Sequence, residues 1–566
     1  MRWIQRPARA PLTTSSADAT FALSWFPDGE RILVTADEGG DELNHVYVRE
    51  ADGTLTDLTP GDAVKASFLG WPADGSEIWI ATNERDGGAF DVYAYDPVSY
   101  ERRMVFENTN ALELAAISPD GRWAALVRPR TSADSDILLA DLTDPGAEPM
   151  LISEHEANIA YGVYDFTADS ETLVYATNEF GEWNQAWTHE LETGAEAALI
   201  EADWDVSYVS YSPSGRYQVS AINADGFTDV TVFDTQAGAE IELPDSVPAG
   251  DLASVRFNED ESEMAFLVTA STAPANVHWV DIGSGEHRQL TEALNPELDP
   301  RDLVEAEVVR FESFDGLTVP GIMYRPHSAS ADTPVPALVW VHGGPGGQSR
   351  AGYSAAIQHL VNNGYAVYAA NNRGSSGYGK TFFHMDDRRH GEEDLRDIVA
   401  AGDFLRGLDW VQDDAVGVIG GSYGGYITAA ALTFHPEAFD LGINIFGVTN
   451  WVRTLESIPP WWESFREALY DEMGDPATDA ERHRAISPLF HADRIIRPML
   501  VVQGANDPRV LQVESDELVA AARENGAEVE YVLFPDEGHG FRRRENRITA
   551  SNAYLDFLET HMGGEG

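Results

Sequence analysis

The sequence of 566 residues contains no cysteine. Its absence excludes disulfides, thiolate metal sites and a cysteine nucleophile. The sequence also lacks any run of 18 apolar residues, the usual signature of a membrane-spanning helix. The first twelve residues carry several arginines but no apolar core of a signal peptide. We therefore expect a soluble, cytoplasmic protein with no membrane partner.

Lysine is almost missing, because Lys65 and Lys380 are the only two and arginine supplies the other 35 of the 37 basic residues. Against these stand 95 acidic residues, giving a net charge of −58. Such a surface repels itself at ordinary salt, whereas at molar salt the Debye length falls to about 3 Å. The composition resembles that of proteins from salt-accumulating haloarchaea. The acidic residues are spread along the chain, which disfavours a polyanionic tail for basic partners, and nucleic acid is not an expected partner.

The first half of the sequence repeats a turn of the Pro-Asp-Gly type at steps of 45 to 49 residues. The six turns begin at Phe26, Pro72, Ser118, Thr167, Ser212 and Asn258. An alternating β pattern follows each turn, and a second follows about ten residues later. This period, with about four short strands per repeat, predicts a β-propeller. We count six blades between about residues 21 and 292, and residues 1–20 leave open extra strands or a partial seventh blade. A tandem array of β-sandwiches fits the regular period less well.

After Leu290 the repeat stops, and a proline-containing acidic stretch that includes residues 305–307 reads as a linker. A β-hairpin is expected within residues 311–324, followed by alternating strands and helices. Expected strands are 337–341, 366–370, 416–419, 442–446, 499–503 and 530–534. Expected helices are 355–363, 393–406, 423–434, 511–525 and 547–561. The predicted architecture is a β-propeller of six to seven blades at residues 1–300, which controls access, and an α/β-hydrolase catalytic domain at residues 301–566.

The chemistry is expected to centre on Ser422, within Gly420-Gly421-Ser422-Tyr423-Gly424. The pattern Gly-x-Ser-x-Gly between a strand and a helix is that of a nucleophile elbow, whose tight turn needs small residues beside the serine. The bare pattern is weak evidence. Its position between an apolar strand and a small-residue helix strengthens it.

Three further loops follow predicted strands and complete the pattern. The glycine-rich loop at residues 342–347 can turn backbone N–H groups toward an oxyanion. Asp507 and His539 follow the last two strands, so that Ser422, Asp507 and His539 occur in the order expected for an α/β-hydrolase triad. Asp536 is a rival acid, although its place three residues before His539 favours a turn-forming role.

His342 precedes the nucleophile in the sequence, and we interpret it as structural rather than catalytic. No cofactor or metal is expected, since the triad needs none and no His/carboxylate cluster has ligand spacing.

With these motifs in view, the second half resembles the prolyl oligopeptidase family of serine peptidases, most of all its acylaminoacyl-peptidase branch. The stretches that carry the resemblance are Phe314-Asp315-Gly316, His342-Gly343-Gly344-Pro345, residues 372–379, residues 420–426, Ser487-Pro488, residues 507–510 and Gly538-His539. The resemblance implies that Ser422 is the nucleophile, His539 the proton relay and Asp507 its orienting acid. It also implies that the N–H groups of Gly344 and Tyr423 form the oxyanion hole.

The same resemblance implies substrate-binding roles for Arg509, which is expected to hold a substrate carbonyl, and for Trp461 and Trp462 on the side of the specificity pocket. A surface ion pair is the alternative for Arg509, and simple packing for the two tryptophans. Dipeptidyl peptidases of the family hold a free N-terminus with a Glu-Glu pair in the propeller. No convincing equivalent is found, because Glu392-Glu393 lies in the other domain at a helix start.

The sequence thus predicts a serine peptidase that hydrolyses short or N-terminally blocked peptides through an acyl-enzyme. The alternatives are a dipeptidyl aminopeptidase or an esterase with the same triad, and a binding protein with an inert hydrolase domain. Whether the chain forms a homo-oligomer stays open.

Overall fold

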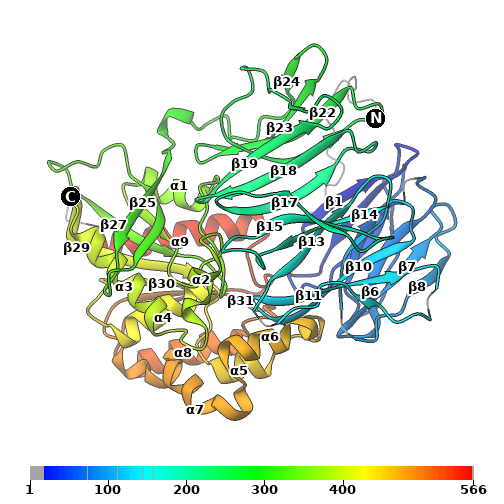
Figure 1. Ribbon diagram of the computed structural model, residues 1–566. Helices are drawn as coiled ribbons and strands as arrows, with labels where there is room; N and C mark the ends of the chain where they lie inside the picture. Colours follow the sequence, from blue (N-terminus) through cyan, green and yellow to red (C-terminus); the bar gives the residue numbers. More distant parts are fainter. Residues whose placement is uncertain (1–17, 73, 111, 145, 157, 564–566) are drawn as a thin grey trace.

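The computed structural model describes residues 18–563 except residues 73, 111, 145 and 157. Its strands β1 to β24 form one part, drawn in blue to green at the upper right of Figure 1. The following strands and the long helices form a second part at the lower left. None of the helices in the described residues is long and apolar enough to cross a membrane.

The first part consists of six four-stranded antiparallel sheets within the described residues, so the predicted propeller is confirmed with six blades. Blades one and two contain β1 (Thr20–Trp25), β2 (Ile32–Ala36), β3 (His45–Arg49), β4 (Leu55–Asp57), β5 (Ala66–Gly70), β6 (Ile78–Asp86), β7 (Ala89–Tyr95) and β8 (Arg102–Phe106). Blades three and four contain β9 (Glu113–Ile117), β10 (Trp123–Thr131), β11 (Asp134–Asp141), β12 (Met150–Leu151), β13 (Tyr161–Phe166), β14 (Thr172–Thr177), β15 (Gln185–Glu190) and β16 (Glu196–Ile200). Blades five and six contain β17 (Asp205–Tyr211), β18 (Tyr217–Ala224), β19 (Phe227–Asp234), β20 (Ala239–Glu240), β21 (Asp251–Phe257), β22 (Glu263–Ala270), β23 (Ala273–Asp281) and β24 (His287–Gln289). The extra strands or partial seventh blade left open for residues 1–20 fall mostly on residues 1–17, outside the described residues.

The repeated turns join the first two strands of each blade. Gly29 N–H donates to the Phe26 carbonyl at 2.9 Å, and Gly121 N–H donates to the Ser118 carbonyl at 2.8 Å. Both glycines have φ above +70°, a conformation that glycine adopts without steric cost. The turn chemistry read from the sequence therefore sets the register of the blades.

The connection between the two parts is shorter than expected. After the 3-10 helix η1 (Pro300–Asp302), strand β25 (Ala306–Glu312) begins and pairs antiparallel with β26 (Thr318–Tyr324). The assignment of residues 305–307 to the linker was therefore wrong for its last two residues. Their side chains alternate between partly buried and exposed, and the hairpin extends the sheet edge to include them.

The second part is built on one eight-stranded sheet in the order β25-β26-β28-β27-β29-β30-β31-β32. Besides the hairpin, the strands are β27 (Val335–Val341), β28 (Ala366–Ala370), β29 (Val411–Gly421), β30 (Gly442–Ile445), β31 (Met499–Gly504) and β32 (Val529–Phe534), of which β32 forms the far edge. From β28 to β32 all neighbours are parallel. The carboxyl ends of these strands therefore meet at one edge, where α/β sheets place their functional loops.

Helices cover both faces of this sheet, as the parallel pattern requires. The helices of the second part are α1 (Ala355–Asn362), α2 (Lys380–Phe383), α3 (Glu393–Arg406), α4 (Tyr423–Phe434), α5 (Trp451–Glu456), α6 (Glu463–Met473), α7 (Pro476–Ile486), α8 (Gln512–Glu524) and α9 (Arg544–Met562), with the 3-10 helices η2 (His384–Asp386), η3 (Pro460–Trp462) and η4 (Pro488–Arg494). Side chains of α1 and α9 share one buried cluster, and those of α3, α4 and α8 share the other. The α/β-hydrolase prediction is confirmed. Helices α2 and α5 to α7 were not predicted, since they mix polar with apolar residues.

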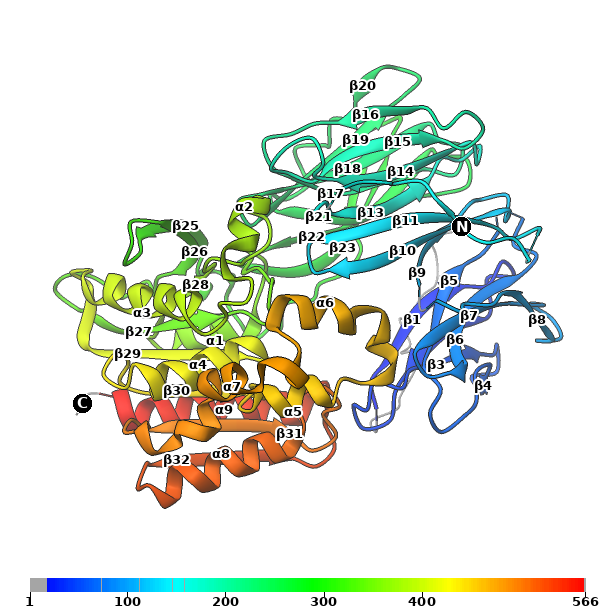
Figure 2. The same cartoon turned by 60° about the horizontal axis from the view of Figure 1, so that its bottom comes forward.

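Helix α6 extends from the hydrolase part toward the propeller, as the turned view in Figure 2 shows. It packs against β10, and Ser464 Oγ donates to the Glu113 carboxylate at 2.9 Å. The two parts also meet where Lys380 Nζ donates to the carbonyl of Asn178 at 3.1 Å. The propeller therefore lies over the loop edge of the sheet.

Candidate active site

Ser422 lies at the sharp turn between β29 and α4, with φ 59° and ψ −120°. A non-glycine residue adopts such a conformation only at an energetic cost of about 1–3 kcal/mol, and these residues cluster at functional sites. A Cβ at Gly420 would lie 2.4 Å from the Gly424 carbonyl oxygen, and one at Gly424 would lie 2.1 Å from the Val341 carbonyl oxygen. The turn therefore requires small residues on both sides of the serine.

Two hydrogen bonds connect three side chains that are far apart in the sequence. His539 Nε2 lies 2.9 Å from Ser422 Oγ, and His539 Nδ1 lies 2.7 Å from Asp507 Oδ2. The other oxygen of Asp507 accepts the N–H groups of Arg509 and Val510 at 2.9 Å each. A carboxylate held in this way fixes the imidazole tautomer, so that Nε2 faces the serine as an acceptor.

The two other candidate groups take different partners. Asp536 accepts from Asn546 at 3.0 Å and pairs with Arg543 at 2.9 Å, so its carboxylate serves the loop and the start of α9. His342 Nε2 lies 2.8 Å from Ser375 Oγ, and its Nδ1 lies 2.8 Å from the Gly343 carbonyl. Burial lowers the pKa of His342, which favours a neutral ring in the base of the glycine loop.

A cavity of about 580 Å³ opens beside Ser422. Its lining includes four candidates from the sequence, which are Gly344, Tyr423, Trp462 and Arg509. Trp461, in contrast, lies outside this lining, and its ring is 5.5 Å from Lys65 Nζ. The apolar end of the cavity is formed by Phe446, Val448, Trp451, Leu455, Ile458, Leu469 and Val510.

Arg509 also contacts the propeller. Its Nε lies 2.7 Å from a carboxylate oxygen of Glu42, and its guanidinium lies over the Trp462 ring at 4.8 Å. Glu42 is 7% exposed and lies in the connection between β2 and β3. We call residues 37–42 of this connection the first-blade loop. Arg509 therefore both forms an ion pair with the propeller and lines the cavity.

The first-blade loop also contacts the loops that carry Asp507 and His539. Asn506 Nδ2 donates to the Gly39 carbonyl at 2.9 Å. A Cβ on Gly40 would lie 2.3 Å from the backbone nitrogen of Gly538, the residue before His539. Backbone therefore packs on backbone here, with no space for a side chain.

Sequence reasoning missed several groups that shape this site. The Phe446 ring contacts the ring of His539 at a centroid distance of 4.7 Å, with the two planes tilted by 52°. Gln503 donates to Asp507 at 3.3 Å and accepts from Ser515 at 2.8 Å. Phe446 and Gln503 are the last residues of the predicted strands 442–446 and 499–503, a position that could have drawn attention to them. Glu42 lies 467 residues from its partner, and no local pattern marks it.

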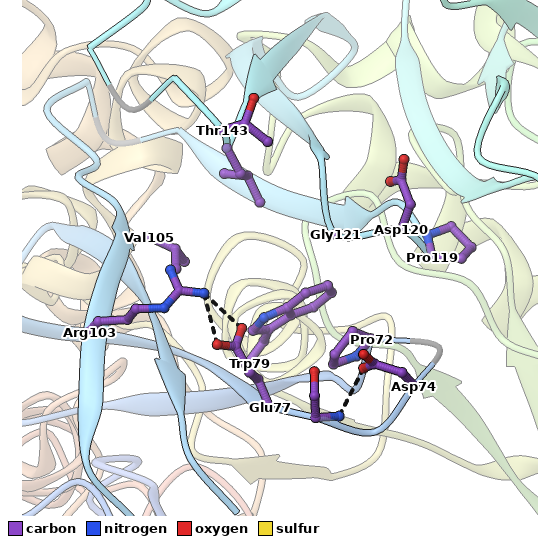
Figure 3. Close-up of a pocket in the computed structure, with 12 residues that line it drawn as sticks. Pro72, Asp74, Glu77, Trp79, Arg103, Val105, Pro119, Asp120, Gly121 and Thr143 are labelled. Carbon is purple, nitrogen blue, oxygen red and sulfur yellow. Dashed lines mark hydrogen bonds and ion pairs between the residues drawn. The ribbon is translucent and has the colours of Figure 1, made fainter.

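A second hollow, of about 410 Å³, lies between blades two and three (Figure 3). Its charged side chains largely satisfy one another. Arg103 pairs with both oxygens of Glu77 at 2.8 and 2.9 Å, and Asp74 accepts the N–H of Ser76. Among the described residues, no group of three or more His, Asp and Glu side chains is arranged to hold a metal ion. The strained turn, the hydrogen-bonded relay and the cavity of about 580 Å³ all lie at Ser422.

Comparison with known proteins places this arrangement in a family. The sequence pattern of the prolyl oligopeptidase family matches residues 351–565. Dipeptidyl aminopeptidase BIII of Pseudoxanthomonas mexicana is 32% identical over 98% of this chain and 82% of its own length. The acylamino-acid-releasing enzyme of Arabidopsis thaliana is 28% identical over 37% of this chain and 28% of its own length. A puromycin-hydrolysing peptidase of Mycobacterium tuberculosis superposes with a TM-score of 0.82 at 22% identity, covering 96% of this chain and 86% of that one.

The chain belongs to the prolyl oligopeptidase family. It is a serine peptidase, a hydrolase acting on peptide bonds, as its sequence predicted.

Proposed function

We propose that this peptidase cleaves short or N-terminally blocked peptides, with Ser422 as nucleophile, His539 as general base and Asp507 as the acid that orients it. The observation that carries the assignment is the continuous relay from Ser422 Oγ through His539 to Asp507, with distances of 2.9 and 2.7 Å. Its placement at the carboxyl ends of parallel strands supports the same roles.

In this mechanism Ser422 Oγ bonds to the scissile carbonyl carbon while His539 Nε2 takes the hydroxyl proton. The carbonyl oxygen becomes an oxyanion, which the N–H groups of Gly344 and Tyr423 stabilise. Cleavage of the C–N bond releases an amine that takes the proton from His539. Water then attacks the acyl ester of Ser422, again with His539 as base, and frees the enzyme.

The composition of the cavity supports a blocked N-terminus. Among the described residues that line it there is no Asp or Glu, and Arg509 is its one Lys or Arg. A free substrate ammonium needs a carboxylate partner when it leaves water, whereas an acyl group accepts a hydrogen bond from Arg509. The apolar end next to Ser422 suits a bulky apolar residue on the acyl side of the cleaved bond.

Release of dipeptides from a free N-terminus is the second candidate. It is favoured by the name of the relative from Pseudoxanthomonas mexicana, and by Glu42, which brings a propeller carboxylate up to Arg509. In this alternative the substrate ammonium pairs with Glu42. An esterase with the same triad remains the third candidate, while the assembled relay and family membership leave the inert binding protein without support.

The propeller's role is also part of the proposal. Residues 1–300 would cap the site and admit only short peptides, while residues 301–566 would carry the chemistry. Ion pairs between the first-blade loop and the hydrolase part support this, since Asp37 pairs with Arg542 at 3.0 Å and Glu42 with Arg509. We further propose a cytoplasmic, halophilic protein, because the chain needs no disulfide and its charge of −58 calls for screening.

The test is hydrolysis, in concentrated KCl, of four chromogenic substrates by the wild type and by Ser422→Ala. The substrates are an acetyl-amino-acid anilide, a free dipeptide anilide, a blocked peptide with internal proline and a short-chain ester. Preferred cleavage of the acetylated anilide, lost in Ser422→Ala, supports the proposal. Preference for the free dipeptide moves the assignment to dipeptidyl release, and turnover of the ester alone moves it to an esterase.

A further inference from the structure

An enclosed polar cluster lies behind the first turn of α4 and has no part in the relay. It consists of Asp386 from η2, His390, Asp394 from α3 and Glu472 from α6, with exposures of 3%, 0%, 0% and 5%. His390 Nε2 lies 3.2 Å from Glu472 Oε1 and 3.5 Å from Asp386 Oδ2. Two carboxyl groups therefore flank one imidazole, with the third, Asp394, near enough to act on its charge, and all four groups are buried. Buried ionisable groups of this kind are rare unless they are paired.

The cluster contacts one side of the proposed oxyanion hole through Tyr423. The Tyr423 hydroxyl donates a short hydrogen bond to Asp394 Oδ2, and the His390 ring meets the Tyr423 ring edge-on at 5.7 Å. The backbone N–H of the same tyrosine is one of the two proposed oxyanion donors. Asp394 is thus hydrogen-bonded to the side chain of Tyr423, the residue whose backbone N–H faces the proposed oxyanion.

The cluster reaches the other side of the hole through the loop after β28. The Asp386 carboxyl group is packed against Gly374, where a Cβ would lie only 1.9 Å from Oδ2. The next residue, Ser375, has its hydroxyl 2.8 Å from His342 Nε2, and His342 contacts the Gly343 carbonyl. A chain of direct contacts therefore runs from Asp386 to the loop that contains Gly344.

The charge of the cluster matters because nothing but protein surrounds it. Three ionised carboxylates with one imidazolium would leave a net buried charge of −2, which is costly. Burial raises the pKa of Asp386 to about 8 and also raises the pKa of Asp394. Burial alone would lower the pKa of His390, but its carboxylate partners, Glu472 first, outweigh this and raise it to about 9. At neutral pH, Asp386 therefore retains its proton and His390 is charged.

Other ionisable groups around the cluster are accounted for. Those that face it are Asp387 beside Asp386, Tyr423 and Tyr426 from α4, and Asp397 from α3. His384 of η2 also faces Glu472, and its hydrogen bond to Asp387 at 2.7 Å raises its pKa. Asp397 is neutralised by Arg373 Nε at 2.8 Å. Burial raises the pKa of both tyrosines far above neutrality, so they stay uncharged. Asp386, with a pKa of about 8, then loses its proton just above neutral pH and before His390, with a pKa of about 9, loses its own.

We propose that Asp386 and Asp394 are positioning residues that hold the two sides of the oxyanion hole from behind, and that Asp386 does so as a neutral carboxylic acid. The inference rests on the proposed function of Ser422. Ionised Asp386 would place a buried negative charge behind the hole in which the transition state develops its own negative charge, and so raise the barrier. The turnover number kcat is then expected to fall above neutral pH because Asp386 ionises, and not because of any change in the relay of Ser422, His539 and Asp507.

The experiment compares kcat and KM between pH 6 and 10 for the wild type, Asp386→Asn and the control Asp471→Asn, whose exposed carboxylate on α6 pairs with Arg388. With the pKa of Asp386 at about 8, the wild type and the control are expected to lose about tenfold in kcat between pH 7 and pH 9. Asparagine mimics the neutral acid, so Asp386→Asn should lose less than about twofold over the same range. If the kcat of Asp386→Asn falls between pH 7 and pH 9 as much as that of the wild type, the proposal is overturned.

Two further variants keep the test decisive if Asp386→Asn does not fold. His390→Gln removes the cation that favours ionised Asp386, so the alkaline limb must move to higher pH, and a limb that stays in place contradicts the proposal. Asp394→Asn should lower kcat by about 10- to 100-fold with KM unchanged, because the oxyanion contact forms only in the transition state. Retained hydrolysis by Ser422→Ala would instead refute the proposed function itself, which separates the two failures.

Discussion

The propeller and the hydrolase part bury their apolar residues in different ways. The propeller has several small clusters made by adjacent strands, such as the one that joins Leu33 and Val46 of blade one to Ile80 of blade two. The hydrolase part has two large clusters, one on each face of a single sheet. In a blade, neighbours in sequence are neighbours in space, whereas the sheet order β26-β28-β27-β29 places distant segments side by side.

This difference explains where the chemistry lies. A repeated local unit can be extended blade by blade, but it brings together only residues that were already close in sequence. A parallel sheet with crossovers brings the ends of β29, β31 and β32 to one edge, so that Ser422, Asp507 and His539 meet. The propeller meets the loops of Asp507 and His539 through the first-blade loop. The predictions below test this division of roles.

The largest effect is expected for the nucleophile. Ser422→Ala should reduce kcat by about 10⁶-fold, because the covalent route is lost. Its melting temperature should stay within a few degrees of the wild type, since the serine hydroxyl contributes one hydrogen bond. Kinetics on the preferred anilide and thermal unfolding check both expectations. Activity within a factor of ten of the wild type would place the chemistry elsewhere.

The next effect separates the two candidate acids. Asp507→Asn should reduce kcat by about 10⁴-fold, because the amide no longer holds the reactive tautomer of His539. Asp536→Asn, the matched control on the neighbouring loop, should change kcat by less than about threefold, as its carboxylate bonds Arg543 and Asn546. Reversed effects of the two substitutions would assign the acid to Asp536.

A smaller effect measures what the propeller contributes to the relay. Gly40→Ala introduces a Cβ 2.3 Å from the backbone of Gly538 and should displace the loop of His539, lowering kcat by about 10- to 100-fold. Gly29→Ala is the control, since Gly29 also has positive φ but no atom within 4 Å of the new Cβ. It should reduce stability by about 1–2 kcal/mol at most and leave kcat unchanged. Equal kcat values for the two variants would show that the contact with Gly538 is dispensable.

The smallest effect concerns the acidic surface that both parts share. The melting temperature should rise by about 5 °C or more between roughly 0.1 M and several molar KCl, as screening removes repulsion. Separate transitions in calorimetry would show whether the two parts gain equally. A melting temperature that stays constant over this range contradicts the halophilic interpretation.

Much of this organisation follows from patterns within the sequence. The blade turns, such as that at Phe26, recur at a fixed period, and strands and helices such as residues 366–370, 393–406 and 423–434 coincide with the observed β28, α3 and α4. Helices α5 to α7 escaped prediction because they mix polar with apolar residues and depend on tertiary packing, α5 and α6 against the cavity and α7 against α5. For the same reason the apolar end of the cavity could not be assembled from the sequence.

Local chemistry was sufficient to identify the propeller, the elbow at Ser422 and the order of the three relay residues, because turns, strand periodicity and glycine requirements act over a few residues. The pairing of Glu42 with Arg509, the contact of Gly40 with Gly538 and the enclosure of Asp386 with His390 arise only when distant segments pack. Burial and the partners of a charge depend on the whole fold, and no local pattern encodes them.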